Sequence, residues 1–221
     1  MAKAEKSRSQ KQTAVSAKKS FHHGDLREAL IAATRELLIE HGPDGFTLAD
    51  ACRRAGVTTA APYKHFRDKR EILEEIVKRA FEEMKEANAR AIAETGRGTI
   101  EGITAMGISY LNFAVSQPAI FRLMFGELKK VQNVDESGRQ CLKNLVEEIA
   151  FFSRKHGHTA DAEQTAIRLW TFVHGASSLE LDDNYEHVAP GLDVRTLIAD
   201  VTPRLLGVAL EKRVSAQGKN R

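Results

Sequence analysis

The sequence predicts an all-α protein, with a three-helix N-terminal module of the helix-turn-helix type followed by a larger helical domain. Two observations lead to this class. Apolar residues recur along the chain at the 3.6-residue period of amphipathic helices, whereas the strict alternation of half-buried strands is missing. The composition, with 42% apolar and 29% charged residues among 221, is that of a soluble globular chain long enough to bury a core.

Charge is distributed unevenly along the chain. The formal net charge is only +3. Residues 1–70 nevertheless hold 14 Lys/Arg against 8 Asp/Glu, and residues 71–221 hold 19 against 22. The basic N-terminal third therefore predicts a polyanionic partner for that part of the chain. Its first 20 residues, rich in Lys, Ser and Gln, are expected to be disordered.

The first two helices are delimited by end signals. We expect the first helix to begin near Asp25, an N-cap candidate, and to stop at Gly42. Thr47, followed three residues later by Asp50, predicts the cap of a second, short helix with the sequence LADACRRA. Gly56 ends that helix as a C′ residue does.

The stretch VTTAAPYKHFRDKREIL, residues 57–73, combines a proline with Tyr and several basic side chains. We expect a short third helix here, capped by Thr58 or Thr59 and reaching about His65. Pro62 would lie at the end of its first turn, where a missing N–H removes at most one hydrogen bond.

A fourth, longer helix follows at once. Asp68 is its predicted N-cap, and the helix is expected to run from Lys69 to about Thr95. Two short helices joined by a tight Gly-containing turn, behind a longer first helix, form the helix-turn-helix pattern.

The rest of the chain continues as amphipathic helices. Gly175 lies in the middle of one of these helices, where glycine is unfavourable, and its presence predicts that another backbone comes close there. The expected elements are a helix from about residue 100 that Pro118 ends, a short apolar helix in PAIFRLMFGEL, a helix through Leu142 and Phe152 that ends near Gly157, and helices over residues 163–181 and 192–210.

A resemblance to the TetR family of bacterial transcription regulators is carried by residues 22–73, HHGDLREALIAATRELLIEHGPDGFTLADACRRAGVTTAAPYKHFRDKREIL. Further on, AEQTAIRLWTFVHGASSLEL resembles the WHG C-terminal domain of one TetR branch, with Trp170, His174 and Gly175 as its landmarks. The N-terminal landmarks are Gly42, Phe46, Thr47, Gly56, Val57, Tyr63, His65, Phe66 and Lys69.

The resemblance implies that the N-terminal module binds double-stranded operator DNA. Its recognition helix would enter the major groove, with Thr58, Thr59, Ala60 and Lys64 able to reach base edges or the adjoining backbone. Tyr63, Lys69 and Thr47 would hold phosphates. The predicted DNA-binding set is Thr47, Thr58, Thr59, Ala60, Tyr63, Lys64, His65 and Lys69.

For the C-terminal domain, the resemblance implies a homodimer built from residues 163–181 and 192–210, and a pocket for a small-molecule effector. Tyr110 and His174 would orient the ligand, with filling of the protein core as the alternative role for each residue. The predicted pocket residues are Met106, Tyr110, Phe121, Met124, Phe125, Phe151, Trp170 and His174.

Other classes of site find no support in the sequence. His156 and His158 flank Gly157 without a carboxylate or thiol at ligand spacing, so no metal is expected. No catalytic constellation or phosphate loop stands out, so neither an enzyme nor a cofactor is expected. The longest apolar run, Ala29 to Ala33, is far too short for a membrane span, and the two cysteines form no motif. We expect a bacterial cytoplasmic protein associated with the nucleoid.

Taken together, the sequence predicts a homodimeric repressor released from a palindromic operator by a small, largely apolar effector. Two alternatives stay open: an effector-independent or architectural DNA-binding protein, and a helical carrier or enzyme with an incidental basic N-terminus. The expected divisions are an arm over residues 1–20 that is either a tail or contacts DNA, a helix-turn-helix domain over 21–70 with its motif at about 47–66, a connecting helix over 71–98, and a ligand-binding and dimerisation domain over 99–214.

Overall fold

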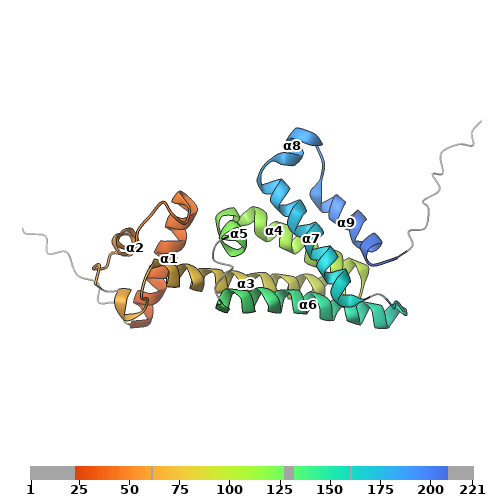
Figure 1. Cartoon of the computed structure of the whole chain (residues 1–221), viewed down its shortest axis with the longest axis horizontal. Coiled ribbons are helices and arrows are strands. Elements are labelled where there is room, and N and C mark those ends of the chain that lie inside the picture. The colour runs from red at the N-terminus through yellow and green to blue at the C-terminus, as the bar shows by residue number, and fades with distance from the viewer. Residues whose placement is uncertain (1–22, 61, 127–131, 160, 209–221) are drawn as a thin grey trace, which may run out of the picture.

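The structure, a computed structural model, describes residues 23–60, 62–126, 132–159 and 161–208, and every regular element within these ranges is helical (Figure 1). The predicted arm over residues 1–20 lies outside them. The elements are α1 (His23–His41), α2 (Leu48–Arg54), the 3-10 turn η1 (Pro62–Lys64), α3 (Lys69–Thr95), α4 (Ile100–Ser116), α5 (Pro118–Phe125), α6 (Gln132–His156), α7 (Ala162–Leu181), α8 (Asn184–Val188) and α9 (Val194–Leu205).

Helices α1 and α2, the turn η1 and the first turns of α3 form a small domain at one end of the molecule, here called the head (Figure 1). The rest of α3 and helices α4–α9 form the body. The predicted cap at Asp25 was wrong, because α1 already begins at His23 and Asp25 lies in its first turn. The stop at Gly42 is confirmed: this residue has a φ of +73°, a left-handed conformation that glycine adopts without strain. The end signals therefore place the first connection correctly and its helix start only approximately.

The third predicted helix is not an α-helix. Among the described residues of this stretch, only Pro62–Lys64 are helical, as a single 3-10 turn. In an α-helix capped by Thr58, Pro62 would have to donate the first intrahelical hydrogen bond, and proline has no N–H to donate. At the first position of η1 the missing donor is not needed, and the Pro62 carbonyl accepts from the backbone N–H groups of His65 and Phe66, both at 2.8 Å.

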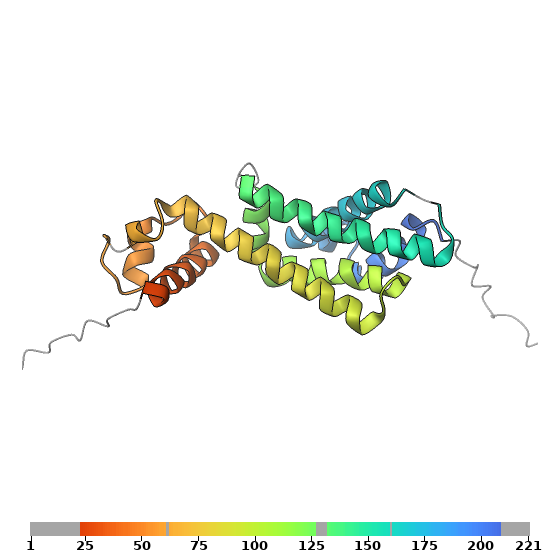
Figure 2. The same cartoon turned by 90° about the horizontal axis from the view of Figure 1, so that it is seen from below.

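Helix α3 links the head to the body of the molecule (Figure 2). It runs from Lys69 to Thr95 as predicted, and the Asp68 side chain accepts from the Glu71 N–H at 3.0 Å as its cap. Its first turns contribute buried side chains such as Ile76 to the head, and its middle contributes buried Phe81 and Met84 to the body, all within one apolar cluster. The head and the body therefore share a continuous core through this helix.

In the body, α6 runs parallel to α3, as the contacts near both ends of α6 show (Figure 2). Gly138, early in α6, lies against the Phe81 ring. Near the other end, the buried Glu148 carboxylate accepts from the Gly98 N–H and from Arg97 Nε at 3.3 Å. Helix α6 thereby fixes the turn between α3 and α4.

Helix α4 returns along the bundle beneath α7 and α9 (Figure 1). The close approach occurs at Gly107, where a Cβ atom would lie only 3.0 Å from Ile198 and 3.3 Å from Val173. The prediction that Gly175 permits such an approach is not met within this chain, since a Cβ atom there would have nothing within 4 Å among the described residues.

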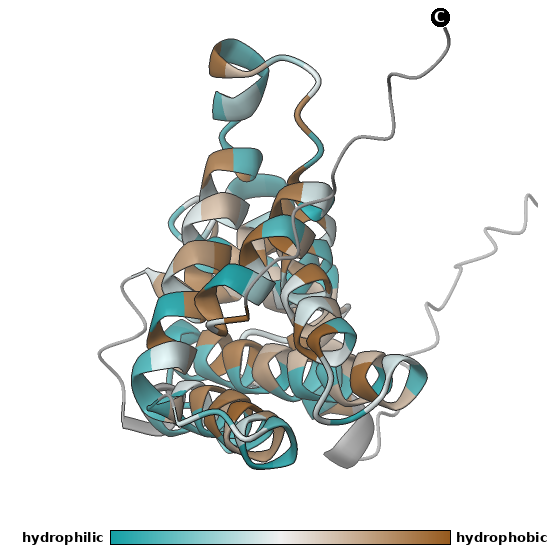
Figure 3. Ribbon diagram, turned by 90° about the vertical axis from the view of Figure 1, so that its right-hand side faces the viewer, coloured by the Kyte–Doolittle hydropathy of each residue, from teal (hydrophilic) through white to brown (hydrophobic). Residues whose placement is uncertain are grey.

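Each helix of the body carries both apolar and polar residues around its circumference (Figure 3). Within the described ranges, no helix combines the length and the apolar character that crossing a bilayer requires. Both cysteines are free thiols; Cys52 is buried and Cys141 is half-buried.

Candidate nucleic-acid interface and ligand cavity

The start of α2 is fixed by a reciprocal capping box. The Thr47 hydroxyl accepts from the Asp50 N–H at 3.2 Å, and the Asp50 carboxylate accepts from the Thr47 N–H at 2.9 Å and from its hydroxyl at 2.6 Å. These hydrogen bonds from Thr47 lower the pKa of Asp50. Thr47, predicted to hold a phosphate, is exposed, but its hydroxyl proton is already donated to Asp50.

The end of α2 is closed by a Schellman arrangement. The Val57 N–H donates to the Cys52 carbonyl at 2.9 Å and the Gly56 N–H to the Arg53 carbonyl at 3.2 Å. Gly56 has a φ of +69°, which confirms its predicted place as the C′ residue. The chain therefore leaves α2 in a fixed direction toward the residues predicted to meet DNA.

These residues form an exposed edge, here called the reading edge and comprising residues 58–60 and 62–64. Pro62 is buried within it, and buried Phe66 follows directly. Tyr63 is 66% exposed, and Thr58, Thr59, Ala60 and Lys64 are also exposed. His65 is half-buried. The buried anchors thus hold the backbone while the predicted contact residues point toward solvent.

Lys69 has a different environment from the other predicted DNA-binding residues. Its Nζ donates to the carbonyls of Pro43 and Phe46, each at 2.8 Å, and lies 4.6 Å from the centre of the Phe46 ring. Because an ammonium has three donors, one remains beyond these two bonds. Lys69 therefore ties the loop before α2 to the start of α3.

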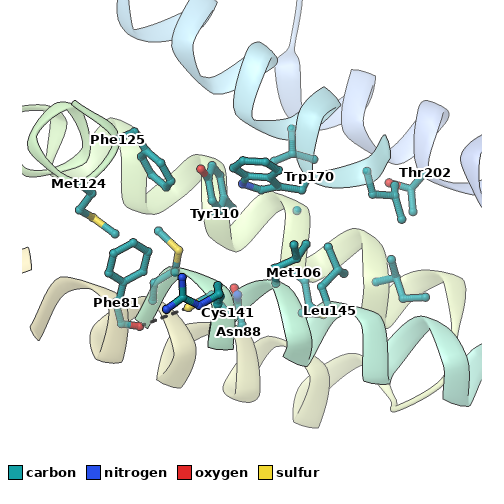
Figure 4. Close-up of a pocket in the computed structure, with 18 residues that line it drawn as sticks. Phe81, Asn88, Met106, Tyr110, Met124, Phe125, Cys141, Leu145, Trp170 and Thr202 are labelled. Atoms are coloured by element: carbon teal, nitrogen blue, oxygen red, sulfur yellow. Dashed lines mark hydrogen bonds between the residues drawn. The ribbon is translucent and has the colours of Figure 1, made fainter. Parts of the chain in front are cut away.

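A cavity of about 330 Å³ lies in the body between α3, α4, α6 and α7 (Figure 4). Most of its surface is apolar. Five of the eight predicted pocket residues line it: Met106, Tyr110, Met124, Phe125 and Trp170.

The other three predicted pocket residues lie elsewhere. Phe121 is buried and packs edge-on against Tyr110, and His174 lies behind Tyr110, so both support the lining from outside. Phe151 is placed away from the cavity, against Gly98 and 4.6 Å from the Arg97 guanidinium. The reason is helical register: the inward side of α6 near that end carries Ile149 and Phe152, both fully buried.

Tyr110 and His174 form a polar pair beside the cavity. The Tyr110 hydroxyl lies 2.8 Å from His174 Nδ1. Burial raises the pKa of Tyr110 well above its ordinary value and lowers that of His174 below 6.5. The pair is therefore a hydrogen bond between two neutral groups, which suits an apolar surrounding.

The residues missed from the sequence come mainly from α3 and α6. Phe81, Met84 and Asn88 line the cavity at positions i, i+3 and i+7 of α3. This spacing was visible in the sequence, but residues 71–98 were predicted to be only a connection. The α6 lining is completed by Gly138, Arg139, Cys141, Leu142 and Leu145.

No cluster of potential metal ligands occurs in the part of the chain that the structure describes. His156 and His158 instead pack their rings around Phe152, at 4.6 and 5.4 Å between ring centres.

Two family models match the chain. Residues 30–76 match the model described as bacterial regulatory proteins, tetR family, and residues 103–201 match a tetracyclin repressor-like C-terminal domain. The first match covers the reading edge and the second covers most of the cavity-forming helices. The WHG subtype stays a prediction.

Similar proteins are found among curated and solved proteins. The HTH-type transcriptional repressor BepR of Brucella suis biovar 1 (strain 1330) is 39% identical over 56 residues, which are 25% of this chain and about a quarter (27%) of BepR. A structure of a protein of unknown function from Rhodococcus sp. RHA1 has a TM-score of 0.74 at 25% identity, covering 87% of this chain and 100% of that one. SmeT, solved with triclosan, has a TM-score of 0.57 at 22% identity, covering 81% and 90%.

Proposed function

This chain belongs to the TetR family of bacterial regulatory proteins and is a DNA-binding transcriptional regulator, and we propose that it acts as a homodimeric repressor released from a palindromic operator by a small, largely apolar molecule. One observation carries the proposal: a single helix, α3, supports the reading edge at its start and forms a wall of the apolar cavity in its middle. A ligand that binds in the cavity can therefore change the position of the head through α3.

In this proposal, the reading edge enters the major groove. Thr58, Thr59 and Ala60 are small and meet base edges or thymine methyl groups, and Lys64 reaches a base or the adjoining strand. The exposed Tyr63 hydroxyl donates to a phosphate. Lys69 acts mainly by holding the loop before α2, with its remaining N–H available to a phosphate.

The dimer is proposed to form through α7. Exposed large apolar side chains gather between residues 167 and 192: Ile167, Trp170, Leu179, Val188 and Leu192. Along α7, Ile167, Thr171, Gly175 and Leu179 follow one another at four-residue spacing, which forms a single ridge here called the α7 ridge. Because Gly175 has open space where a Cβ would lie, a partner helix can approach closely there.

A dimer also suits the operator. Helix-turn-helix dimers place two recognition elements about 34 Å apart, one turn of B-DNA, and so read palindromic half-sites. Each half-site alone would be held by one reading edge, so affinity depends on both heads engaging together.

The cavity supports a small effector. Its volume of about 330 Å³ falls at the lower end of the range of about 300–1,000 Å³ for ligand pockets. SmeT was solved with triclosan, and we propose the same broad class for this chain: a compact molecule with an apolar body.

A polar network offers the route from the cavity to the head. Helix α5 carries the cavity residues Met124 and Phe125, and Gln117 precedes its first turn. Gln117 bonds to Arg35 of α1, and its Nε2 donates to Glu83 of α3 at 3.2 Å.

The third side of this network joins α1 directly to α3. Arg35 donates to both carboxylate oxygens of Glu83, at 2.9 and 3.2 Å, and these bonds lower the pKa of Glu83. A ligand that displaces α5 would move Gln117 and, through the hydrogen bonds among Gln117, Arg35 and Glu83, would also move α1. Repression then ends only if the ligand prefers the conformation in which the heads no longer match the operator.

The proposal is tested by selecting binding sites from random DNA with the full chain and measuring operator affinity by gel shift. We expect a palindrome, and we expect Tyr63→Phe to weaken binding to all selected sites alike, by about tenfold. Tyr185→Phe, in α8 of the body, is the matched control and should leave affinity unchanged. Absence of any sequence preference would instead favour the alternative of an incidental basic N-terminus.

The effector part is tested separately, by thermal shift against a library of small apolar compounds followed by gel shift with each stabilising compound. A compound that raises the Tm and lowers operator affinity supports release. If none does so, the chain is an effector-independent DNA-binding protein.

A further inference from the structure

The cavity is lined by an amide whose oxygen has no hydrogen-bond partner in the part of the chain that the structure describes. Asn88, on α3, lines the cavity (Figure 4), and its Oδ1 is fully buried with no hydrogen-bond partner among the described residues. A buried carbonyl oxygen without a partner is unfavourable, and native structures contain few of them. Such an atom facing a cavity indicates that something else supplies its partner.

The neighbouring polar side chains of the lining already have partners. The Tyr110 hydroxyl pairs with His174, and the Thr202 hydroxyl donates to the Ile198 carbonyl at 2.8 Å. The Cys141 thiol is directed at the Phe81 carbonyl at 3.9 Å. Asn88 differs from these groups because no described residue donates to its oxygen.

The charge near the cavity is balanced. Arg139 reaches the lining, but its guanidinium bonds twice to the Glu136 carboxylate, at 2.9 and 3.2 Å. Its side chain is 63% exposed, so water screens what remains of its field. Burial is the main cause of the raised pKa of the Cys141 thiol, and nearby Glu82 adds to it. Lys85 acts in the opposite direction, but its ammonium bonds to the Glu82 carboxylate at 3.1 Å. Arg139 is the one cation among the described residues that line the cavity, and it is already paired, so an anionic ligand would enter an apolar space without a free cation from this lining.

The apolar lining surrounds Asn88 on several sides. Phe81 and Met84 lie on the same helix, Met106 lies on α4, and Leu145 lies on α6. Trp170 and Tyr110 close the cavity from α7 and α4 (Figure 4). A ligand that fills this space must be apolar over most of its surface and polar only where it meets the amide.

We propose that the effector is a neutral molecule with an apolar body and one hydroxyl or N–H group, and that this group donates to Oδ1 of Asn88. This inference rests on the proposed effector function and names the chemical class that the cavity selects. Asn88 is then the residue that determines specificity, because an analogue without the donor would leave the amide oxygen buried and unpaired.

Three probes with the same alkylbenzene body test this assignment: 4-butylphenol, butylbenzene and 4-butylbenzoate. The chain has one tryptophan, and Trp170 lines the cavity, so binding is followed by its fluorescence. We expect the wild-type protein to bind 4-butylphenol about tenfold more tightly than butylbenzene, and 4-butylbenzoate most weakly.

The variant Asn88→Leu removes the amide while keeping a similar volume. It should bind 4-butylphenol and butylbenzene with affinities within about threefold of each other. Its Tm without ligand should be no lower than that of the wild type, because the amide makes no hydrogen bond to another described side chain or backbone group that could be lost. Asn112→Leu, on the exposed side of α4, is the matched control and should retain the preference for 4-butylphenol.

The outcomes separate this inference from the proposed function. Equal binding of 4-butylphenol and butylbenzene by the wild type, or a preference that survives in Asn88→Leu, overturns the role of Asn88 and leaves the effector function standing. Tightest binding of 4-butylbenzoate overturns the neutral class in favour of an anion held through Arg139. If none of the three probes binds, this inference is overturned, and the effector function fails with it only if the thermal-shift screen of the compound library also finds no ligand.

Discussion

The head and the body satisfy their polar groups in different ways. In the head, Thr47 and Asp50 cap each other, and Lys69 bonds to two backbone carbonyls of a neighbouring loop. In the body, the Asn88 amide faces a cavity, and its oxygen has no partner within the described ranges. These groups of the head are therefore satisfied as folded, and although the buried Thr34 hydroxyl of α1 also has no partner among the described residues, it does not line the cavity. The body differs because an atom of this kind, Oδ1 of Asn88, lies at a cavity that another molecule can enter.

Because of this difference, substitutions in the two parts are expected to have different effects. Variants in the head should act either on folding or on DNA contact, and rarely on both. Variants in the body should change how the chain responds to a second molecule, whether that molecule is a ligand or another copy of the chain.

The largest effect is expected on the α7 ridge. The double variant Ile167→Glu, Leu179→Glu places two charges on the proposed dimer surface, and we expect monomers in sedimentation experiments. Loss of the second head should weaken operator binding by about 10²- to 10⁴-fold. Val115→Glu, on α4, changes another exposed apolar side chain and is the matched control. A double variant that remains dimeric would move the interface away from this ridge.

The second prediction separates folding from DNA contact within the head. Lys69→Met leaves two carbonyls without their donor, and we expect the free energy of unfolding to fall by about 1–3 kcal/mol. Lys64→Met removes an exposed ammonium, so it should leave the Tm unchanged and flatten the salt dependence of DNA binding by about one unit of slope. If instead Lys69→Met flattens the slope without lowering the Tm, the predicted phosphate contact of Lys69 outweighs its bonds to the loop.

The third prediction concerns communication between the two parts. Arg35→Met should leave ligand affinity nearly unchanged but reduce the effect of ligand on operator affinity, which in coupled systems is about 5- to 150-fold. Arg122→Met is the control. Arg122, on α5, bonds at 2.8 Å to Asp182 at the C-terminal end of α7, so its bond does not connect the body to the head. Release that is undiminished in Arg35→Met would exclude the Arg35–Glu83–Gln117 triangle as the route.

The smallest effect is expected from pH. Burial holds the pKa of His174 below its ordinary value of 6.5, so the unfolded chain takes up a proton at a higher pH than the folded chain does. The free energy of unfolding should therefore fall as the pH is lowered through 6.5 toward the folded value. In His174→Asn, which has no titrating ring, this part of the pH dependence should be absent from thermal melts. A slope of opposite sign in the wild type would mean that the imidazolium is stabilised.

Much of the head could be predicted from sequence because its signals are local. Thr47 with Asp50, Gly56, and Asp68 before Lys69 each act within a few residues, and the structure confirms the elements that they delimit. The α-helix predicted around Pro62 was wrong. The predicted helix started at Thr58 or Thr59, whereas in the described residues helical structure starts at Pro62 itself. At that position the missing N–H of proline removes no intrahelical hydrogen bond.

The body was predicted less completely because a cavity depends on contacts between helices that are distant in sequence. Apolar periodicity shows which residues face inward, but it does not distinguish a lining residue from a second layer, as Phe121 and His174 illustrate. The register of α6 places the Phe151 side chain outside the cavity, against Gly98. Asn88 was missed because an isolated amide on a helix has no signal in the sequence until its surroundings are known.

Helix α3 has a mechanical consequence. Its 27 residues span about 40 Å at 1.5 Å per residue, without an internal proline or glycine at which it could bend. Such a rod tilts as a whole about the point where it is gripped. If α3 is held near the turn that Glu148 fixes at its far end, a ligand in the cavity displaces the helix at a point close to this fixed end. The reading edge lies at the opposite end of the helix and then moves further. A shift of α3 by less than the width of a side chain beside the ligand would therefore become a larger shift at the DNA.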